Sequence, residues 1–445
     1  MSTEQPERVP PSATVDRDSR PPVAALPWLR SRGATALLVD LAAVMVAVLT
    51  FVIVGTALTG DLHGFILSLD FPKIYLRDFE RWYVPQGKAI FDSPHPTPKY
   101  LYSAFFAIVL SVFEDNTIAE ARAQWMAFQA VLIVVFCVLI NFAVFGQRRP
   151  RLALVTPFLV VASVPIWHNF LWGQVSLIMT VGALLVVFVQ PDRPWTRVLA
   201  AGTGVVAAIK YYPAVMLAAL VGSREWRSAV ILVGAAVLAF VAVPVVGIGW
   251  DDFVTFTRAT SDRVGGRDFS GTVNSLHVPH VLLRVLEVPK ENWDGLLPSL
   301  RWIGRFIFAA HAGLAFIVCL RLTCGLRRRL TLGAALLLLP LPFVVATSWP
   351  HYFTFLPFAQ ALVLALLLDS DDDSIGPPTA VWLRLPLLGA AVLAVALGSL
   401  PWFGLMENWK EMSRYGFLTW SALLTLVIVD VLVVRGLVRR RQRSR

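Results

Sequence analysis

Charged residues are scarce in this sequence, and their scarcity excludes a soluble globular protein. Only 15% of the 445 residues are Asp, Glu, Lys or Arg, whereas 57% are hydrophobic, and the mean hydropathy is +0.67. A soluble domain of this composition would have too little polar surface to cover its apolar residues. The apolar residues come in blocks of roughly 17 to 25, the length of a membrane-spanning helix. We therefore expect an all-α polytopic membrane protein whose main partner is the lipid bilayer.

Three further absences narrow the class of protein. Cysteine is rare, and Cys137, Cys319 and Cys324 show no spacing typical of a disulfide framework or a metal site. No cleavable signal peptide is visible, because residues 1–29 are polar and rich in proline. We expect these residues to form a disordered cytoplasmic tail. There is also no glycine-rich loop of the kind that binds nucleotides.

The net charge of +10 does not indicate nucleic-acid binding, because the positive residues lie in short clusters between apolar blocks. Such clusters are typical of the cytoplasmic ends of spanning helices. Placing all of them in the cytoplasm predicts roughly 11 to 12 membrane segments within residues 30–435, with both termini inside. Residues 436–445 then form a basic cytoplasmic tail. The clusters are those at Arg30/Arg32, Arg148/Arg149/Arg151, Arg193/Arg197, Arg224/Arg227, Arg327/Arg328/Arg329 and the C-terminal tail.

This topology makes specific demands on two apolar runs. Leu101–Phe113 is too short to span comfortably and is expected not to cross. The block around Lys210 is expected to enter and leave as two half-length pieces, kinked at Pro213. The long polar stretches at about 60–122 and 250–300 then face outwards, together with most of the polar side chains near the span ends.

The first outward loop carries acids that are well placed for chemistry. It reads Arg77-Asp78-Phe79-Glu80-Arg81, and a carboxylate at the membrane surface can act as a general base toward a hydroxyl. The same charges also fit a solvated, ion-paired helix face, which the local sequence favours. Asp61 and Asp92 are rival acids in this loop. Asp78 and Glu80 together could hold a divalent cation, so a divalent metal is left open while no other cofactor is expected.

Two polar residues stand at breaks in apolar blocks. Gln174 follows Gly173 at the mouth of a span and offers both a donor and an acceptor. The alternative is an interfacial aromatic belt with a capping glycine. Lys210 lies within an apolar block, where a lysine is costly unless it faces a cavity or an anion. Snorkelling of its ammonium to the interface is the alternative.

Two more candidates lie late in the chain. His351 follows Ser348-Trp349-Pro350 at the mouth of another span and suits either a phosphate oxygen or an interfacial anchor. The outward loop at 250–300 includes Asn274 and is a plausible lid over an acceptor, although long loops are often simply variable.

Taken in order, these features resemble the multispanning glycosyltransferases of the C superfamily, specifically family 87. That family includes mannosyltransferases of phosphatidylinositol mannoside synthesis and arabinofuranosyltransferases of arabinan synthesis. The resemblance covers the chain from about Ala34 to Leu368. The similar pieces are Asp78-Phe79 with Tyr83 and Gly87, Leu101-Tyr102, Gly173-Gln174, Lys210-x-x-Pro213 and Trp349-x-His351-Tyr352.

The resemblance implies an activity as well as a helical bundle of the C-superfamily type. A sugar (mannose, another hexose or arabinofuranose) would pass from a polyprenyl-phosphate donor to a glycolipid or cell-envelope glycan on the outer face of the cell membrane. Asp78 would be the general base of an inverting reaction that requires no metal, with no nucleic-acid partner. The residues implied to bind substrate are Glu80, Tyr102, Gln174, Lys210, Asn274 and His351.

A secondary transporter or lipid flippase is the main alternative, because transporters also have interrupted spans with intramembrane charges. Two features argue against it. The sequence shows no twofold internal repeat, and its polar residues gather on one face of the membrane rather than at the midplane. A non-catalytic membrane scaffold is a third possibility, in which the outward polar residues would be a coincidence.

Overall fold

The computed structural model describes residues 27–60, 76–97, 99–145, 154–266, 275–368, 381–399 and 409–443. Every regular element within these ranges is a helix, which confirms the predicted all-α class. Residues 40–445 form one compact unit and residues 1–39 a second. The following description concerns the larger unit.

The helices are short and numerous, and many are separated by one or two residues. The α-helices are α1 (Pro27–Thr59), α3 (Val84–Ala89), α4 (Ala104–Leu110), α5 (Ile118–Ile140), α7 (Val155–Val161), α8 (Val164–Trp172), α9 (Ser176–Leu185), α10 (Arg197–Ile209), α11 (Met216–Gly222), α12 (Trp226–Val237), α13 (Val243–Ile248), α14 (Trp250–Gly266), α15 (Val278–Val285), α16 (Trp293–Arg321), α17 (Leu326–Leu338), α18 (Leu356–Leu368), α19 (Val381–Ser399), α20 (Trp409–Arg414) and α21 (Phe417–Arg443).

Short 3₁₀ and π segments link or extend several of these helices. They are η1 (Phe79–Tyr83), η2 (Ser111–Phe113), η3 (Asn141–Phe145), η4 (Val186–Phe188), η5 (Pro194–Thr196), η6 (Tyr212–Val215), η7 (Leu238–Ala242), η8 (Lys290–Asn292), η9 (Leu341–Phe343) and η10 (Pro350–Phe353).

Several described helices are long and apolar enough to cross a membrane, so the chain is a polytopic membrane protein. There are 5 such helices, or 6 if α7 and α8, which are bent by 52° at their junction, count as one span. Apolar helices of 10–17 residues also occur, including Ala104–Phe113. The predicted total of segments stays a prediction. The 5 long helices are Ile118–Phe145, Trp226–Ile248, Lys290–Arg321, Pro350–Leu368 and Phe417–Arg439.

The predicted break at Lys210 is confirmed. Helix α10 ends at Ile209, Lys210 takes an extended conformation with φ −155° and ψ 134°, and η6 begins at Tyr212. Pro213 explains the break, because it lacks an N–H and cannot continue the helix. The predicted outward loop at 250–300 is more helical than expected, because α14, α15 and the start of α16 occupy much of it.

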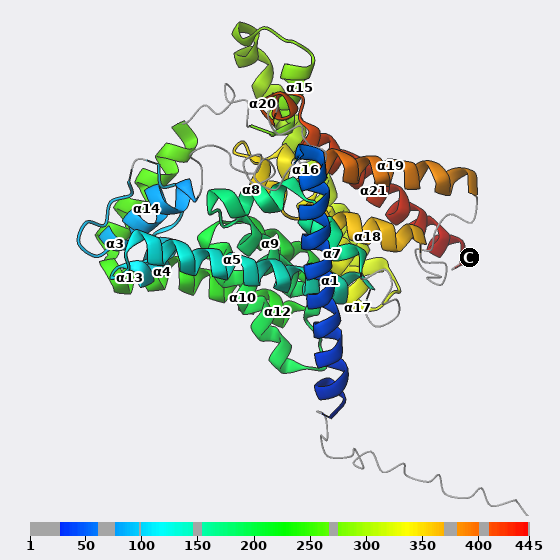
Figure 1. The fold of residues 1–445 in the computed structure, drawn as a ribbon, viewed down its shortest axis with the longest axis horizontal. Coiled ribbons are helices and arrows are strands. Elements are labelled where there is room, and N and C mark those ends of the chain that lie inside the picture. The colour runs from blue at the N-terminus through cyan, green and yellow to red at the C-terminus, as the bar shows by residue number, and fades with distance from the viewer. Residues whose placement is uncertain are drawn as a thin grey trace, which may run out of the picture. The chain divides into compact units, whose positions relative to one another are not determined.

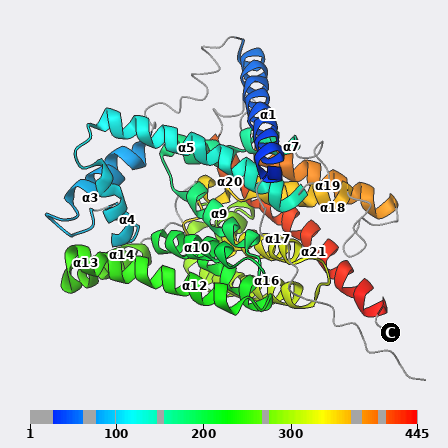
Figure 2. The ribbon, with the colours of Figure 1, turned by 90° about the horizontal axis from the view of Figure 1, so that it is seen from below.

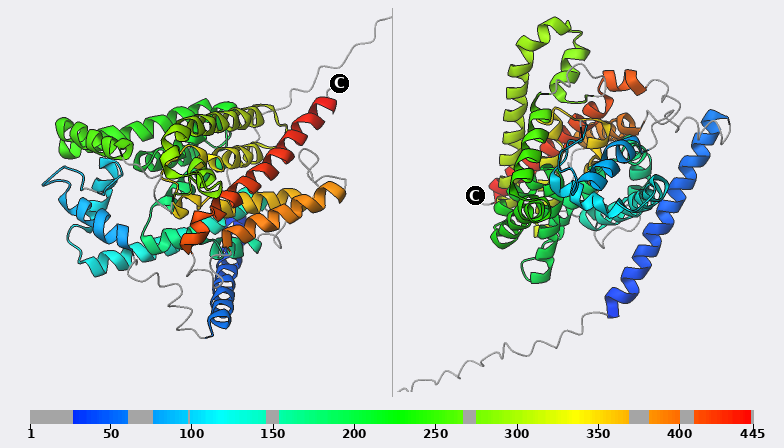
Figure 3. Two further views of the ribbon diagram at one scale, coloured as in Figure 1. Left: turned by 90° about the horizontal axis from the view of Figure 1, so that it is seen from above. Right: turned by 90° about the vertical axis from the view of Figure 1, so that its left-hand side faces the viewer.

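Two groups of helices lie toward opposite ends of the larger unit. Helices α3, α4, α13 and α14 gather at one end, and α18, α19 and α21 at the other (Figure 1, Figure 2). Within the second group, α19 and α21 pack side by side (Figure 3). The helices between these groups, α8 to α12, bring together residues that are far apart in the sequence.

Helices α10 and α12 pack closely because α10 has a glycine where they cross. A Cβ atom on Gly204 would lie 2.2 Å from the backbone oxygen of Leu232. Gly234 in α12, by contrast, has no atom within 4 Å of the position of an added Cβ.

We expect Gly204→Ala to lower the stability of the protein by roughly 1 to 3 kcal/mol, because α10 and α12 must move apart. The measurement is thermal unfolding of the purified protein in detergent. Gly234→Ala is the matched control and is expected to be neutral or slightly stabilising, since alanine favours a helix more than glycine does. Equal melting temperatures for the two variants would contradict the close packing.

Candidate active site

A cavity of about 930 Å³ lies where η1, α10, η7, α14 and η10 meet. Among the residues expected from the sequence, Asp78, Tyr102, Gln174, Lys210 and His351 all line it. Glu80 does not line it, and Asn274 lies outside the described residues. The fold therefore brings together, in one cavity, polar residues that are up to 273 positions apart in the chain (351 − 78).

Asp78 is held at the cavity wall by buried neighbours on either side. The Leu76 backbone N–H donates to the Leu171 carbonyl at 2.6 Å. The Phe79 ring is fully buried and stacks on Trp125, with 4.6 Å between ring centroids. Because both anchors lie in the core, the carboxylate between them has a fixed place.

The carboxamide of Gln174 donates through Nε2 to Oδ2 of Asp78. Its Oε1 lies 2.9 Å from the Tyr83 hydroxyl and 3.1 Å from the Tyr102 hydroxyl, both of which can donate to it. The two hydroxyls are themselves 2.9 Å apart. An amide oxygen that faces hydroxyl donors leaves the amide nitrogen to face the carboxylate. The two tyrosines thus fix the orientation of Gln174, and Gln174 holds Asp78.

A glycine allows this contact to form. Gly173 ends α8 in the left-handed conformation, with φ +65°, which glycine adopts without steric cost. A Cβ atom at this position would lie 2.6 Å from Cβ of Phe79. The turn that carries Gln174 therefore packs directly against the residue that follows Asp78.

A chain of hydrogen bonds between buried amides holds the backbone of Gln174. Gln129 Nε2 donates to the Gln174 carbonyl at 2.8 Å, and Asn169 Nδ2 donates to Gln129 Oε1 at 3.0 Å. Asn169 Oδ1 in turn accepts from the Leu177 N–H at 3.1 Å. Gln129 was not among the predicted site residues, although an amide within an apolar span is a signal that could have indicated it.

Burial raises the pKa of Asp78 to about 6. Three groups oppose this rise by favouring the ionised carboxylate: the positive charge of Arg77, the hydrogen bond from Gln174 and the positive charge of Lys99. A carboxylate with a pKa near 6 is largely ionised at neutral pH, yet it is basic enough to accept a proton from a hydroxyl as that hydroxyl reacts.

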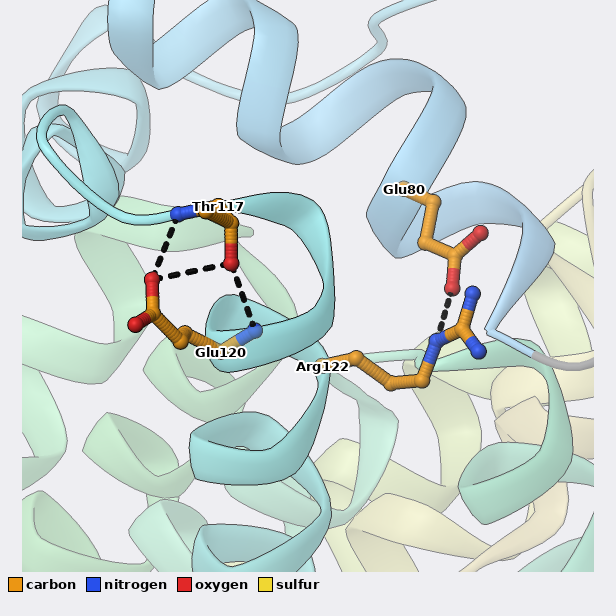
Figure 4. A network of polar contacts seen from close by, with 4 residues as sticks. All are labelled: Glu80, Thr117, Glu120 and Arg122. Atoms are coloured by element: carbon orange, nitrogen blue, oxygen red, sulfur yellow. Dashed lines mark hydrogen bonds and ion pairs between the residues drawn. The ribbon is translucent and has the colours of Figure 1, made fainter.

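Glu80 lies two residues further on and has a different partner. Its Oε1 is 2.5 Å from Nε of Arg122, an ion pair between η1 and α5 (Figure 4). Close by, Thr117 and Glu120 form a capping box at the start of α5 (Figure 4). The alternative prediction for this stretch, an ion-paired surface, thus holds for Glu80. Asp78, by contrast, lines the cavity.

Lys210 lies in an aromatic cage at the cavity wall. Its Nζ donates to the Tyr352 hydroxyl and lies 4.2 Å from the centroid of the Tyr352 ring. The ring centroids of Tyr102 and Tyr212 are 5.2 Å and 5.5 Å away. Aromatic faces stabilise a cation that has left water. The lysine therefore faces a cavity, the condition under which an intramembrane charge is tolerated.

His351 is buried beside this cage and has a second histidine as its partner. Its Nδ1 lies 3.3 Å from Nδ1 of His168, with the two rings stacked. The His168 ring also stacks on Trp172, which lines the cavity. His168 was missed in the sequence, because it reads there as part of an interfacial aromatic run.

No group of three or more His, Cys, Asp or Glu side chains with metal-binding geometry occurs among the described residues. Glu80, which was considered together with Asp78 as a ligand of a divalent cation, forms an ion pair with Arg122.

The comparison with protein families identifies the class of this protein. The model of glycosyltransferase family 87 matches residues 100–347, more than half of the chain. The chain belongs to glycosyltransferase family 87. Within this family-87 enzyme the matched region contains Tyr102, Gln174 and Lys210, whereas Asp78 precedes it and His351 follows it. No curated protein and no solved structure matches the chain.

Family membership makes this family-87 protein a membrane glycosyltransferase, as the resemblance in the sequence predicted. The cavity is the candidate for its active site, because it brings a carboxylate and a cation together.

Proposed function

We propose that this glycosyltransferase moves a sugar from a polyprenyl-phosphate donor to a glycolipid or cell-envelope glycan, with inversion at the anomeric carbon. The sugar is mannose, another hexose or arabinofuranose. The observation that carries the proposal is the composition of the cavity. Asp78 and Lys210 share it with a wall of apolar side chains from a membrane-spanning helix.

The apolar wall suits a lipid-borne donor. Val237 in α12 and Phe240 in η7 line the cavity, and they remain 54% and 36% exposed. They belong to the candidate span Trp226–Ile248, of which only 22% is buried in the protein. A prenyl chain bound along this helix would stay in an apolar environment while its phosphate enters the cavity.

Asp78 and Lys210 have separate roles in the proposed reaction. Asp78 accepts the proton of the acceptor hydroxyl while the oxygen of that hydroxyl attacks the anomeric carbon. On the opposite side the bond from that carbon to the phosphate oxygen breaks, and the electron pair stays on the phosphate. Lys210 and His351 stabilise the charge that develops there, as donors in an enclosed cavity do most effectively. Tyr102 lies between the two groups, in contact with both Gln174 and the cage of Lys210. Asn274 stays a proposed acceptor-binding residue of the outward loop.

We further propose that the site faces outwards across the cell membrane. The positive clusters at Arg193/Arg197, Arg224/Arg227 and Arg327/Arg328/Arg329 support a cytoplasmic position for the opposite face. In intact cells, a membrane-impermeant maleimide should label Lys99→Cys, an exposed residue at the cavity, in a variant that lacks Cys324. Arg227→Cys should react only after permeabilisation. Labelling of Arg227→Cys alone would place the site in the cytoplasm.

Asp78→Asn should reduce sugar transfer by about 10²- to 10⁴-fold, because the amide keeps the shape of the carboxylate but cannot accept the proton. Transfer from polyprenyl-phosphate mannose or arabinofuranose by the purified enzyme is the measurement, with donor binding expected to survive. Glu80→Gln is the control and should be far milder, since Glu80 is paired with Arg122 outside the cavity. Should Glu80→Gln be inactive while Asp78→Asn transfers at the parent rate, Glu80 is the base.

The pH dependence of the parent enzyme checks the same assignment. A base works only when ionised, and the pKa of Asp78 is raised to about 6. The value of kcat/KM should therefore be lost as the pH falls through about 6. Gln174→Leu removes a hydrogen bond that lowers this pKa, so the fall should begin at a higher pH in that variant. An unchanged profile in Gln174→Leu would separate the pH dependence from Asp78.

Lys210→Met should weaken donor binding by about 10- to 100-fold, because a charge-assisted contact with the phosphate is lost. Folding should be preserved, since an apolar side chain costs less in this environment than a charge. Lys88→Met is the matched control: Lys88 donates to the carbonyls of Glu114 and Asn116 and does not line the cavity. Unchanged donor affinity in Lys210→Met would show that the ammonium serves the packing of the tyrosine cage alone.

A further inference from the structure

The contact between His168 and His351 constrains which ring nitrogens carry a proton. The two Nδ1 atoms face each other at 3.3 Å, with His168 7% and His351 1% exposed. Two N–H groups cannot point at each other, and two lone pairs would repel. One Nδ1 must therefore donate and the other accept. The protonation of each ring is thus set by the other.

The place of His351 favours His168 as the donor, because His351 lines the cavity and His168 does not. When His168 Nδ1 donates, His351 accepts at Nδ1, and a neutral imidazole that accepts at one nitrogen carries its proton on the other. The proton of His351 then lies on Nε2, which gives the cavity a hydrogen-bond donor. His351 also shares the cavity with the Lys210 ammonium, and a second positive charge there would be repelled.

We propose that His168 is a positioning residue that holds His351 as the Nε2–H tautomer, so that His351 donates a hydrogen bond to the leaving phosphate. The inference rests on the proposed function, in which a phosphate leaves on the Lys210 side of the cavity. The opposite tautomer would present a lone pair to the phosphate and repel it. Trp172, stacked on His168 at 5.3 Å between centroids, keeps the ring in place.

The role of His168 can be tested with substitutions that place a hydrogen-bond donor at different distances from Cβ. The amide nitrogen of asparagine lies the same number of bonds from Cβ as Nδ1, whereas that of glutamine matches Nε2. His168→Asn therefore keeps a donor toward His351, and His168→Gln and His168→Leu do not. We expect kcat to fall by about 10- to 100-fold in the Gln and Leu variants, with a smaller change in donor KM, and to be largely rescued in the Asn variant.

The second measurement is a double-variant cycle. If His168 acts through His351, then His168→Leu combined with His351→Leu should be no slower than His351→Leu alone. His311→Gln is the control for the general loss of a partly buried histidine, because His311 pairs with Asp430 between α16 and α21 and does not line the cavity. Its kcat should equal that of the parent.

Three results would overturn the inference while leaving the proposed function intact. The Asn, Gln and Leu variants could have the same kcat, the two leucine substitutions could act additively, or the Asn variant could be the slowest of the three. The comparison between the polar Asn and Gln variants does not depend on whether His168→Leu folds. If the parent enzyme transfers no sugar from polyprenyl-phosphate mannose or arabinofuranose, the proposed function itself fails.

Discussion

A carboxylate that leaves water must keep hydrogen-bond donors or lose its charge, and in this glycosyltransferase the donor to Asp78 is Gln174. The rest of the site depends on that contact. Gly173 must adopt a left-handed conformation for Gln174 to reach Asp78. Tyr83 and Tyr102 must face the amide oxygen so that the amide nitrogen faces the acid. A hydrogen bond between residues 96 positions apart thus aligns η1 with α8 and α9.

Lys210, the second charged group, is stabilised in a different way. Asp78 keeps neutral and charged donors close by, whereas Lys210 is surrounded by tyrosine rings and has a single hydroxyl partner that the structure describes. Aromatic faces attract a cation without neutralising it. The ammonium therefore remains able to attract a phosphate, while an ion pair with a carboxylate would have cancelled its charge. The cavity thus keeps a negative and a positive group apart on its wall, although such groups would otherwise pair.

Much of this arrangement could be predicted from the sequence, and the limits of that prediction have physical causes. Apolar blocks, Pro213 and the isolated charge of Lys210 are local signals, so the all-α class and the break in the helix were predictable. The choice of Asp78 over Glu80 came from the family resemblance and not from the local sequence, because both carry the same charge on the same short segment. Only tertiary contacts separate them: Gln174 binds one and Arg122 the other. The role of Gln129 and His168 likewise depends on partners 40 or more positions away.

Under the proposed function, the break after Ile209 also affects the release of product. Lys210 stands at the C-terminus of α10, where the helix presents unpaired carbonyl oxygens and a partial negative charge. That end of the helix stabilises the ammonium but opposes an anion that stays beside it. A lipid phosphate held by Lys210 would therefore be bound less tightly than by a lysine at a helix N-terminus. With the proposed polyprenyl-phosphate donor, the interrupted helix would thus favour turnover, since the spent carrier would have to return to the bilayer before another donor could enter.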